Sequence, residues 1–370
     1  MKYINCIIVF FFAIHTNLSA QQAGTWYAFG NPEDEELIGF KDKDGEIRIL
    51  PKFIGLMEGR KFDDILAAIE MTDSGLLTYY LTKPGRVIGR DSLFFFDNMP
   101  DCENEGFIRF HDKQTDQIGM FNRNGDIVIP ASYNALARVM NGLVAGLKNA
   151  EKQSWHGHDH DEHAGCNHYS WAGGQSVLLD TANRVLIEEF NYEGTIDYYS
   201  LRITDAPIED SRRLNFKSVD DTYYSFVHFE KEFLIWLNEM VLTDISEEKL
   251  LAASYDSITW TPSSSWEAES KYDFIKRNFN ILRDRLLLMK QPEFDYYIIS
   301  GGLNQFIFES DEFKRYYNNC GDPKDWQYPV ISLILNHRDD NRLTQDHLDF
   351  LRTNKGYRLL SVSLRSGYLQ

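Results

Sequence analysis

Ile residues alternate with polar or differently facing residues in two short segments of the first half of the chain, residues 47–49 and 127–129, which each read Ile-x-Ile. Alternation is the periodicity of a β-strand, because successive side chains point to opposite faces. Each segment follows a turn sequence that ends in Asp-Gly or Asn-Gly, at residues 42–45 and 122–125. These pairs favour tight hairpin turns, since Asn, Asp and Gly tolerate a positive φ. The pattern therefore predicts two β-hairpins, each ended by a proline that removes a backbone donor.

The two hairpins are copies of one pattern. Both read Ile-Gly, five residues, Gly, an acidic residue, Ile, any residue and Ile, starting at Ile38 and Ile118. A weaker third copy spans residues 177–187, with Asn183 at the position of the turn glycine. Asn is the next best residue for that backbone conformation. Shared spacing of this kind indicates a repeated architecture.

These copies resemble the WG-repeat (KWG-repeat) family of bacterial proteins. In that family a Trp-Gly pair opens a strand, an Asp-x-x-Gly turn follows, and Ile-Pro closes the unit. In this chain Ile38-Gly39 and Ile118-Gly119 stand in place of Trp-Gly. The resemblance covers roughly residues 36–195. It implies a repeated β structure and an interaction role, and it implies no catalytic residues.

The second half of the chain, from about Lys217, has the spacing of helices and buried strands. Apolar residues recur every three or four positions, as on one face of an amphipathic helix, and Ser246 is a suitable N-cap. The predicted elements are a helix over residues 226–240, a short helix after Ser246, a helix over 272–287, a buried strand over 296–299, a strand over 328–335, a helix over 343–351 capped by Thr344 and ended by Gly356, and a strand over 357–364.

Together these patterns predict an α+β protein with two parts. Residues 21–215 form an N-terminal repeated β-hairpin module of WG-repeat type, and residues 217–370 form a mixed α+β C-terminal domain. Residues 205–221 are the predicted linker. The sequence pattern of the C-terminal domain identifies no family.

The first twenty residues predict export. Met1-Lys2 provides a charged start, residues 7–13 are apolar, and Leu18-Ser19-Ala20 ends in a small residue suited to cleavage, which together indicate a secretory signal peptide over residues 1–20. An uncleaved N-terminal anchor is the alternative, although the apolar run is short for a spanning helix. No later stretch is long and apolar enough to span a bilayer. We expect the mature protein in the periplasm, on the cell surface or outside the cell.

The charge of the chain bears on its partners. It contains 38 Lys and Arg against 56 Asp and Glu, a net charge of −18. Such an acidic chain does not favour nucleic acid or anionic lipid, because phosphate contacts need a basic surface. Its 20 Tyr and 25 Phe build either a core or an exposed face, and an exposed aromatic face suits a protein, peptide or glycan partner.

Three cysteines remain after removal of the signal peptide: Cys102, Cys166 and Cys320. An odd number cannot form a complete disulfide framework. The sequence is compatible with one disulfide and a free thiol, or with three reduced and mostly buried thiols.

One stretch carries candidate metal ligands. Residues 155–168 hold five of the ten histidines of the chain, and imidazole, carboxylate and thiol groups are ligands for Zn²⁺, Cu²⁺ or Ni²⁺. The alternating spacing is typical of a flexible metal-gathering loop rather than of a four-ligand zinc fold. A solvated loop with adventitious metal affinity is the alternative. The candidate ligands are His156, His158, His160, His163, Cys166 and His168.

Two classes of function remain. The first is an exported binding protein whose repeat half presents a β surface to a protein, peptide or glycan, with metal affinity in the His-rich loop. The second is a hydrolase or other enzyme with its site in the C-terminal domain, around Ser300, His337 and Arg338. The first is favoured, because no set of nucleophile, base and stabilising donor can be assembled from the sequence.

Overall fold

The structure of the protein is a computed structural model that describes residues 24–30, 36–54, 59–154, 169–192, 195–261, 265–339, 342–365 and 369. Strand accounts for 50% of the structure and helix for 14%, and most of the sheets are antiparallel. The predicted α+β class is therefore wrong, and the protein is mostly β. Among the described residues, no helix combines the length and the apolar character needed to cross a membrane.

The first part of the chain forms a seven-stranded sheet in the order β4-β1-β2-β3-β5-β6-β7. Its core is aromatic: Phe40, Phe53 and Phe62 are at most 1% exposed and pack against Trp26. The strands are β1 (Trp26–Gly30), β2 (Leu37–Lys41), β3 (Ile47–Ile54), β4 (Lys61–Phe62), β5 (Ile65–Thr72), β6 (Gly75–Thr82) and β7 (Val87–Ile88).

Four smaller sheets follow. They are a hairpin of β8 (Phe95–Phe96) and β9 (Met99–Pro100), a three-stranded sheet of β10 (Phe107–Asp112), β11 (Gln117–Asn122) and β12 (Ile127–Tyr133), a four-stranded sheet of β13 (Ala135–Leu136), β14 (Leu143–Lys148), β17 (Gln175–Asp180) and β18 (Val185–Glu188), and a hairpin of β15 (Glu151–Ser154) and β16 (Tyr169–Ala172).

The three predicted hairpins are formed by β2–β3, β11–β12 and β17–β18. They share one turn chemistry, in which the side-chain oxygen of Asp42, Asn122 or Asp180 accepts two backbone N–H groups, two and four residues ahead. However, the hairpins belong to sheets of seven, three and four strands. They are therefore not units of a uniform hairpin module, because each pairs with different neighbours.

The glycine that opens the first copy is required by close packing. A Cβ atom on Gly39 would lie 2.3 Å from the Ile49 carbonyl oxygen and 2.6 Å from the Pro51 nitrogen, where β2 and β3 change register. We expect Gly39→Ala to lower the free energy of unfolding by about 1–3 kcal/mol, since the backbone must move. Urea denaturation measures this. Gly30→Ala is the matched control, because a Cβ at Gly30 meets no atom within 4 Å. An equal effect of both variants would refute the packing argument.

The predicted linker is part of a sheet. β20 (Arg213–Lys217) lies inside residues 205–221, and β21 (Tyr223–His228) pairs with both β20 and β19 (Ile196–Thr204). Hydrogen bonding therefore crosses the boundary predicted at residues 215–217. β21 leads directly into α1 (Phe229–Leu237), so the three-stranded sheet is joined to the C-terminal part without a spacer.

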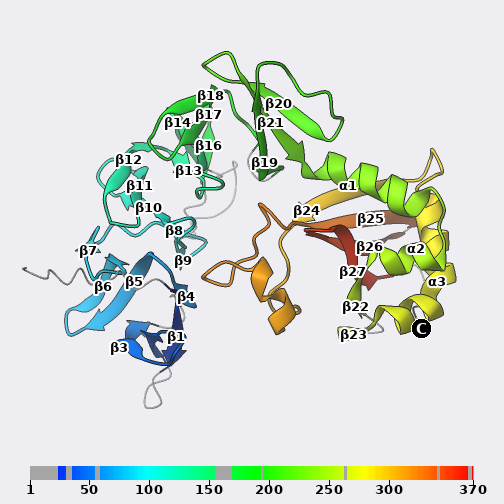
Figure 1. Ribbon diagram of the computed structural model, residues 1–370, viewed down its shortest axis with the longest axis horizontal. Helices are drawn as coiled ribbons and strands as arrows, with labels where there is room; N and C mark the ends of the chain where they lie inside the picture. The colour runs from blue at the N-terminus through cyan, green and yellow to red at the C-terminus, as the bar shows by residue number, and fades with distance from the viewer. Residues whose placement is uncertain are drawn as a thin grey trace, which may run out of the picture.

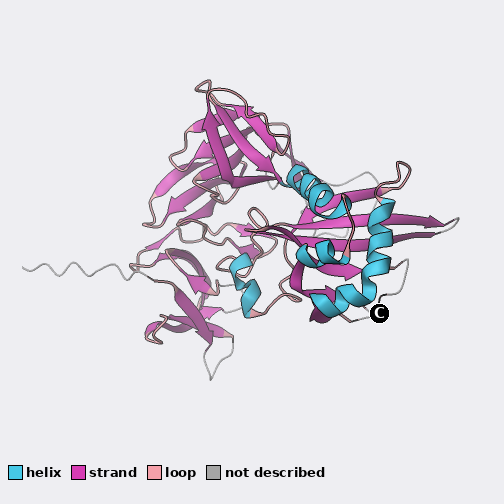
Figure 2. Ribbon diagram, turned by 45° about the vertical axis from the view of Figure 1, so that its right-hand side comes forward, coloured by secondary structure: helices cyan, strands magenta, loops and turns pink. Residues whose placement is uncertain are grey.

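The second half is a six-stranded sheet with helices (Figures 1 and 2). Its strand order is β23-β22-β27-β26-β25-β24. One face packs against α1 and α3 through Phe233 and Phe274, and the other packs against the segment around η3 through Phe313 and Tyr316. The elements are η2 (Asn238–Leu242), α2 (Glu247–Ala252), β22 (Ser254–Trp260), β23 (Glu267–Ser270), α3 (Lys271–Leu288), β24 (Tyr296–Gly301), η3 (Asp311–Tyr316), β25 (Val330–Asp339), β26 (Arg342–Thr353) and β27 (Gly356–Ser363).

Several predictions for this half are confirmed and others are wrong. α3 matches the helix predicted over 272–287, and the Ser246 hydroxyl caps α2 by accepting the Lys249 N–H. The predicted helix over 343–351 is instead β26, which pairs with β25 on one side and β27 on the other. Thr344 therefore caps no helix, and Gly356 with φ of 85° belongs to a hairpin turn. β24 is an exposed edge strand rather than a buried one.

The sheets follow one another along an arc (Figure 1). It runs from β1 at the lower left, through β19 to β21 at the top, to the six-stranded sheet on the right. The chain between β24 and β25, residues 302–329, then turns back into the interior of the arc and reaches the first half. We call this stretch the return segment.

Candidate functional site

The predicted metal ligands lie outside the described residues. His156, His158, His160, His163, Cys166 and His168 all fall within residues 155–168, which connect the paired ends of β15 and β16. The metal-binding prediction therefore stays a prediction. Within the described ranges, no group of three or more His, Cys, Asp or Glu side chains is arranged to hold a metal ion.

The residues suggested for a C-terminal enzyme site are not brought together. Ser300 pairs with Ile331 on β25, whereas His337 lies six residues further along the same strand. At about 3.3 Å per residue this is a separation of roughly 20 Å. Arg338 forms an exposed ion pair with Asp295, in which Nη2 lies 3.1 Å from Oδ2. His337 is therefore too far from Ser300 to act as its general base.

His337 lies beside a buried ion pair between Arg285 and Asp346. Its Nε2 atom lies 3.0 Å from Oδ2 of Asp346, which is fully buried. The Nε of Arg285 donates to the same oxygen at 2.8 Å, and the other Asp346 oxygen accepts the Arg365 N–H. The carboxylate is therefore committed to holding α3 and the C-terminal residues against β26.

The exposed aromatic residues of the first half do not gather on one sheet. Among the described residues they are Tyr27, Phe95, Phe96, Tyr169, Tyr192 and Tyr199, and they belong to β1, β8, β16, the chain after β18, and β19. The predicted aromatic β surface stays a prediction.

A polar cavity of about 260 Å³ lies where the three-stranded sheet, α1 and the β26–β27 hairpin meet the return segment. Its walls come from four parts of the chain that are far apart in sequence. The lining residues are Asp197, Glu232, Gln327, Tyr328, Arg352, Thr353, Asn354 and Gly356. We call this the Arg352 cavity.

The Arg352 guanidinium organises the wall of the cavity. Its Nη2 lies 2.8 Å from Oδ2 of Asp197, and its Nε donates to Oε2 of Glu232 at 2.7 Å. Its Nη1 donates to the Gln327 carbonyl at 2.9 Å, and the ring of Phe229 lies 5.0 Å from the guanidinium carbon. One side chain of β26 thus binds β19, α1 and the return segment together.

Local structure explains the position of each acid. Asp197 precedes an irregularity in the pairing of β19 with β21, and its own Oδ1 accepts the Tyr199 N–H at 2.9 Å. Glu232 lies in the first turn of α1, where a negative charge is favourable. The Tyr357 hydroxyl donates to Glu232 at 3.0 Å from the neighbouring strand. Both carboxylates are therefore fixed before any ligand binds.

The pKa values follow from burial and from this pairing. Burial raises the pKa of Asp197, and the nearby Arg352 only partly offsets the rise. Burial acts to lower the pKa of Arg352, but Glu232 and Asp197 outweigh it and raise the pKa. Burial, with Glu232 adding to it, also raises the pKa of Tyr357. Asp197 is thus a buried acid whose pKa stays above its usual value in spite of the ion pair with Arg352.

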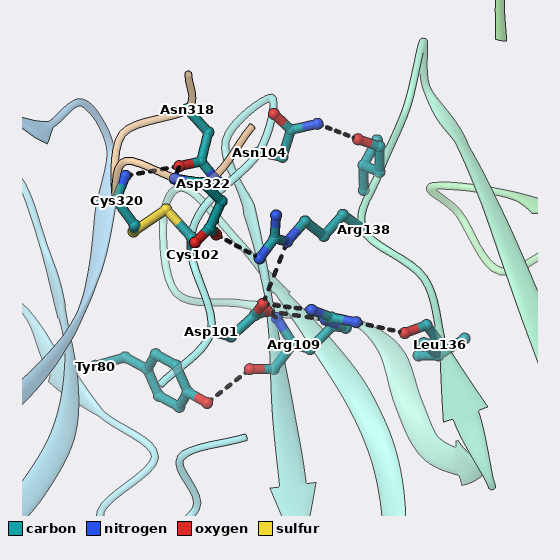
Figure 3. Close-up of polar contacts among 11 residues, drawn as sticks. Tyr80, Asp101, Cys102, Asn104, Arg109, Leu136, Arg138, Asn318, Cys320 and Asp322 are labelled. Carbon is teal, nitrogen blue, oxygen red and sulfur yellow. Dashed lines mark hydrogen bonds and ion pairs between the residues drawn. A yellow bond between two sulfur atoms is a disulfide. The ribbon is translucent and has the colours of Figure 1, made fainter. Parts of the chain in front are cut away.

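A disulfide fixes the return segment to the first half. Cys102 and Cys320 are bonded although 218 positions separate them in sequence. Next to the bridge, Arg138 donates to Asp322 at 2.9 Å (Figure 3). Asn319 donates to Asp63 at 2.7 Å. The bridge therefore holds the stretch that supplies Gln327 and Tyr328 to the cavity.

A buried ion pair supports the other side of the bridge (Figure 3). The Asp101 carboxylate is bound by Arg109 through Nε at 3.0 Å, and Arg138 lies 3.8 Å away. Burial acts to raise the pKa of Asp101, but the two guanidinium groups outweigh it and lower the pKa. Arg109 also donates to the Leu136 carbonyl at 2.8 Å. Asp101, the residue before Cys102, is thus held in place by two guanidinium groups.

A second cavity beside the disulfide is too small for a ligand. Its volume is about 30 Å³, which suits one or two water molecules. Glu103 lies in its wall and accepts the backbone N–H groups of Asp64 and Ile65, each at 2.9 Å. Burial raises the pKa of Glu103 to about 7.

The raised pKa of Glu103 predicts a pH effect on stability. A buried acid with a raised pKa stabilises the fold most below its unfolded value of 4.5, and the stabilisation is lost as pH rises through about 7. Glu103→Gln should therefore be more stable than the native protein at pH 8, by up to about 3 kcal/mol, and similar to it at pH 4. Urea denaturation at both pH values tests this, with the exposed Glu209→Gln as control. A difference independent of pH would contradict the assignment.

No family model, curated protein or solved structure matches the chain.

The residues of the Arg352 cavity were missed by sequence reasoning. Asp197, Glu232 and Arg352 lie on β19, α1 and β26, and no local spacing connects them. The one available signal was a charged residue next to apolar residues, at Asp197 after Ile196 and at Arg352 after Phe350-Leu351. Charged residues in such positions are rarely buried unless they are paired.

Proposed function

We propose that the protein is an exported, non-catalytic binding protein that takes a small polar ligand into the Arg352 cavity. The observation that supports this most is the set of polar side chains fixed around the cavity by Arg352, Tyr357 and the Gln327 carbonyl. Side chains held in place before binding lose little conformational entropy when a ligand arrives.

The size and lining of the cavity suit a small ligand. Binding cavities for drug-sized molecules measure about 300–1,000 Å³, and this one of about 260 Å³ lies just below that range. Its lining includes Gln327, Asn354 and Tyr328, which can hydrogen-bond a polar molecule or contact the face of a ring. A single sugar ring or an amino acid is therefore a better candidate than a folded protein.

Binding is favoured over catalysis by the state of the two acids. A general base is oriented toward the reacting proton of its substrate, rather than toward a cation of the protein itself. Here Asp197 and Glu232 are both engaged by Arg352, and Glu232 also accepts from Tyr357. The arrangement resembles a fixed recognition surface more than an acid–base pair.

Two features support export. The signal-peptide pattern of residues 1–20 is one. The Cys102–Cys320 bridge is the other, because disulfides persist mainly in oxidising compartments outside the cytosol.

A ligand screen tests the proposal. The mature protein is mixed with a set of sugars, amino acids, amines and small acids, and binding is detected by saturation-transfer NMR. We expect saturable binding of at least one compound class, with every bound compound recovered unchanged after prolonged incubation. Conversion of a compound into a product would replace the binding function with the enzyme alternative. Absence of binding across the set would reject the cavity as a ligand site.

A further inference from the structure

We infer that the ligand of the Arg352 cavity carries a protonated primary amine that docks against the carboxylates of Asp197 and Glu232. The inference rests on the proposed function and specifies the chemistry of its ligand. It is argued from the charges of the lining, the hydrogen-bonding capacity that remains there and the burial of Asp197.

The charges of the lining favour a cation. The lining residues include two acids, Asp197 and Glu232, and one base, Arg352, so their formal sum is −1. Asp197 is only 6% exposed, which limits how far water can stabilise its charge. A ligand with one positive charge brings this sum to zero.

Arg352 has little capacity left for an anionic ligand. A guanidinium has five N–H groups. Its Nε donates to Glu232, its Nη2 lies against Asp197 and also reaches Glu232 at 3.4 Å, and one Nη1 N–H donates to Gln327. About one N–H group therefore remains, whereas an anion is normally bound by a guanidinium through two parallel hydrogen bonds.

The carboxylates retain spare acceptor capacity. Two carboxylates offer about eight lone-pair positions. The described contacts are those of Arg352 to both acids, of the Tyr199 N–H to Asp197 and of the Tyr357 hydroxyl to Glu232. About three positions are left for a ligand. An ammonium group supplies three N–H donors and one positive charge, and so matches both requirements.

The pKa of Asp197 agrees with this geometry. Burial raises it although Arg352 lies within hydrogen-bonding distance. A second cation beside the carboxylate would favour its charged form and lower the pKa. Binding of an ammonium group should therefore release protons when it is measured close to the pKa of Asp197.

Matched pairs of probes test the inference on the full mature protein. n-Propylammonium is compared with n-propanol, which has the same size but no charge, and glucosamine is compared with glucose. We expect the amine of at least one pair to bind at least about tenfold more tightly than its neutral partner, since hydrogen bonds to charged groups are the stronger ones.

Variants test whether the amine binds in the cavity. Asp197→Asn should weaken amine binding about tenfold or more, whereas Asp295→Asn, which removes a surface partner of Arg338, should leave it unchanged. Because Asp197→Asn removes a buried charge and could unfold the protein, Asn354→Lys is the second variant. Asn354 is exposed at the cavity, so a lysine there should fold, occupy the acids and abolish amine binding, whereas Asn354→Gln should retain it.

The outcomes separate the inference from the proposed function. Equal binding of amine and neutral probes, or preferential binding of the neutral ones, overturns the ammonium inference and leaves a polar-ligand site. Amine binding that survives both Asp197→Asn and Asn354→Lys overturns it as well, because the amine then binds elsewhere. If no probe binds and the wider screen is also negative, both the inference and the proposed function fail.

Discussion

The double variant Cys102→Ser/Cys320→Ser is expected to lose about 5 kcal/mol of unfolding free energy relative to the oxidised protein. The bridge closes a chain segment of 218 positions, and the entropy that a cross-link removes from the unfolded chain grows with the length of the closed segment. The native side of the bridge adds to the effect, because the contacts of Arg138 with Asp322 and of Asn319 with Asp63 depend on where it holds the return segment.

Guanidinium denaturation with and without reductant measures this effect. Reduction should lower the midpoint for the native protein and leave the midpoint for the double variant unchanged. Thiol titration of the unfolded, unreduced protein provides an independent control, since a bridged protein gains two reactive thiols on reduction. Identical denaturation curves under oxidising and reducing conditions would show that the bridge contributes nothing.

The second large effect is expected at Arg352. Arg352→Leu leaves the buried Asp197 and the partly buried Glu232 without their shared cation, and breaking a buried ion pair by removing one partner typically costs about 3–5 kcal/mol. The loss should be greatest at pH 8 and smaller near pH 5, because protonation of the uncompensated acids relieves the penalty.

The matched control for this variant is Arg338→Leu. Arg338 makes an exposed ion pair with Asp295, and exposed pairs contribute about 0–1 kcal/mol. Urea denaturation of both variants at pH 5 and pH 8 gives the comparison. If Arg352→Leu were no more harmful than Arg338→Leu, the guanidinium would not be organising the cavity wall.

Local patterns in the sequence predicted the elements that local chemistry determines. The turns after Asp42 and Asn122 are determined by side-chain acceptors and by glycine with positive φ, so their hairpins could be predicted. α3 could be predicted in the same way, because its apolar face carries the helical period through Phe274, Leu282 and Leu286. In each case the decisive residues lie within a few positions of one another.

Elements determined by distant neighbours were not predicted correctly. In β26, Leu348 and Leu351 have helical spacing, yet pairing with β25 and β27 on both edges makes this segment the interior of a sheet. Here tertiary pairing outweighs the local preference. For the same reason the pairing of Cys102 with Cys320, left open by the cysteine count, follows only from the path of the return segment.

The Arg352 cavity could not be predicted because its parts meet only in the folded chain. Asp197 stands at a strand irregularity, Glu232 in a helix turn and Arg352 near a hairpin. None of these positions carries a sequence motif. The His-rich stretch differs from the cavity, because its candidate metal ligands are neighbours in the sequence and can be recognised from composition alone.

The most direct test of the account asks whether ligand binding takes place in the Arg352 cavity. The dissociation constant of the best compound from the screen is measured for the native protein, for Asn354→Trp and for Lys355→Trp. Both substitutions fall at exposed neighbouring positions of one turn, but only Asn354 lines the cavity. We predict that Asn354→Trp abolishes binding and that Lys355→Trp retains it. Equal binding by the two variants would contradict the account and place the ligand elsewhere.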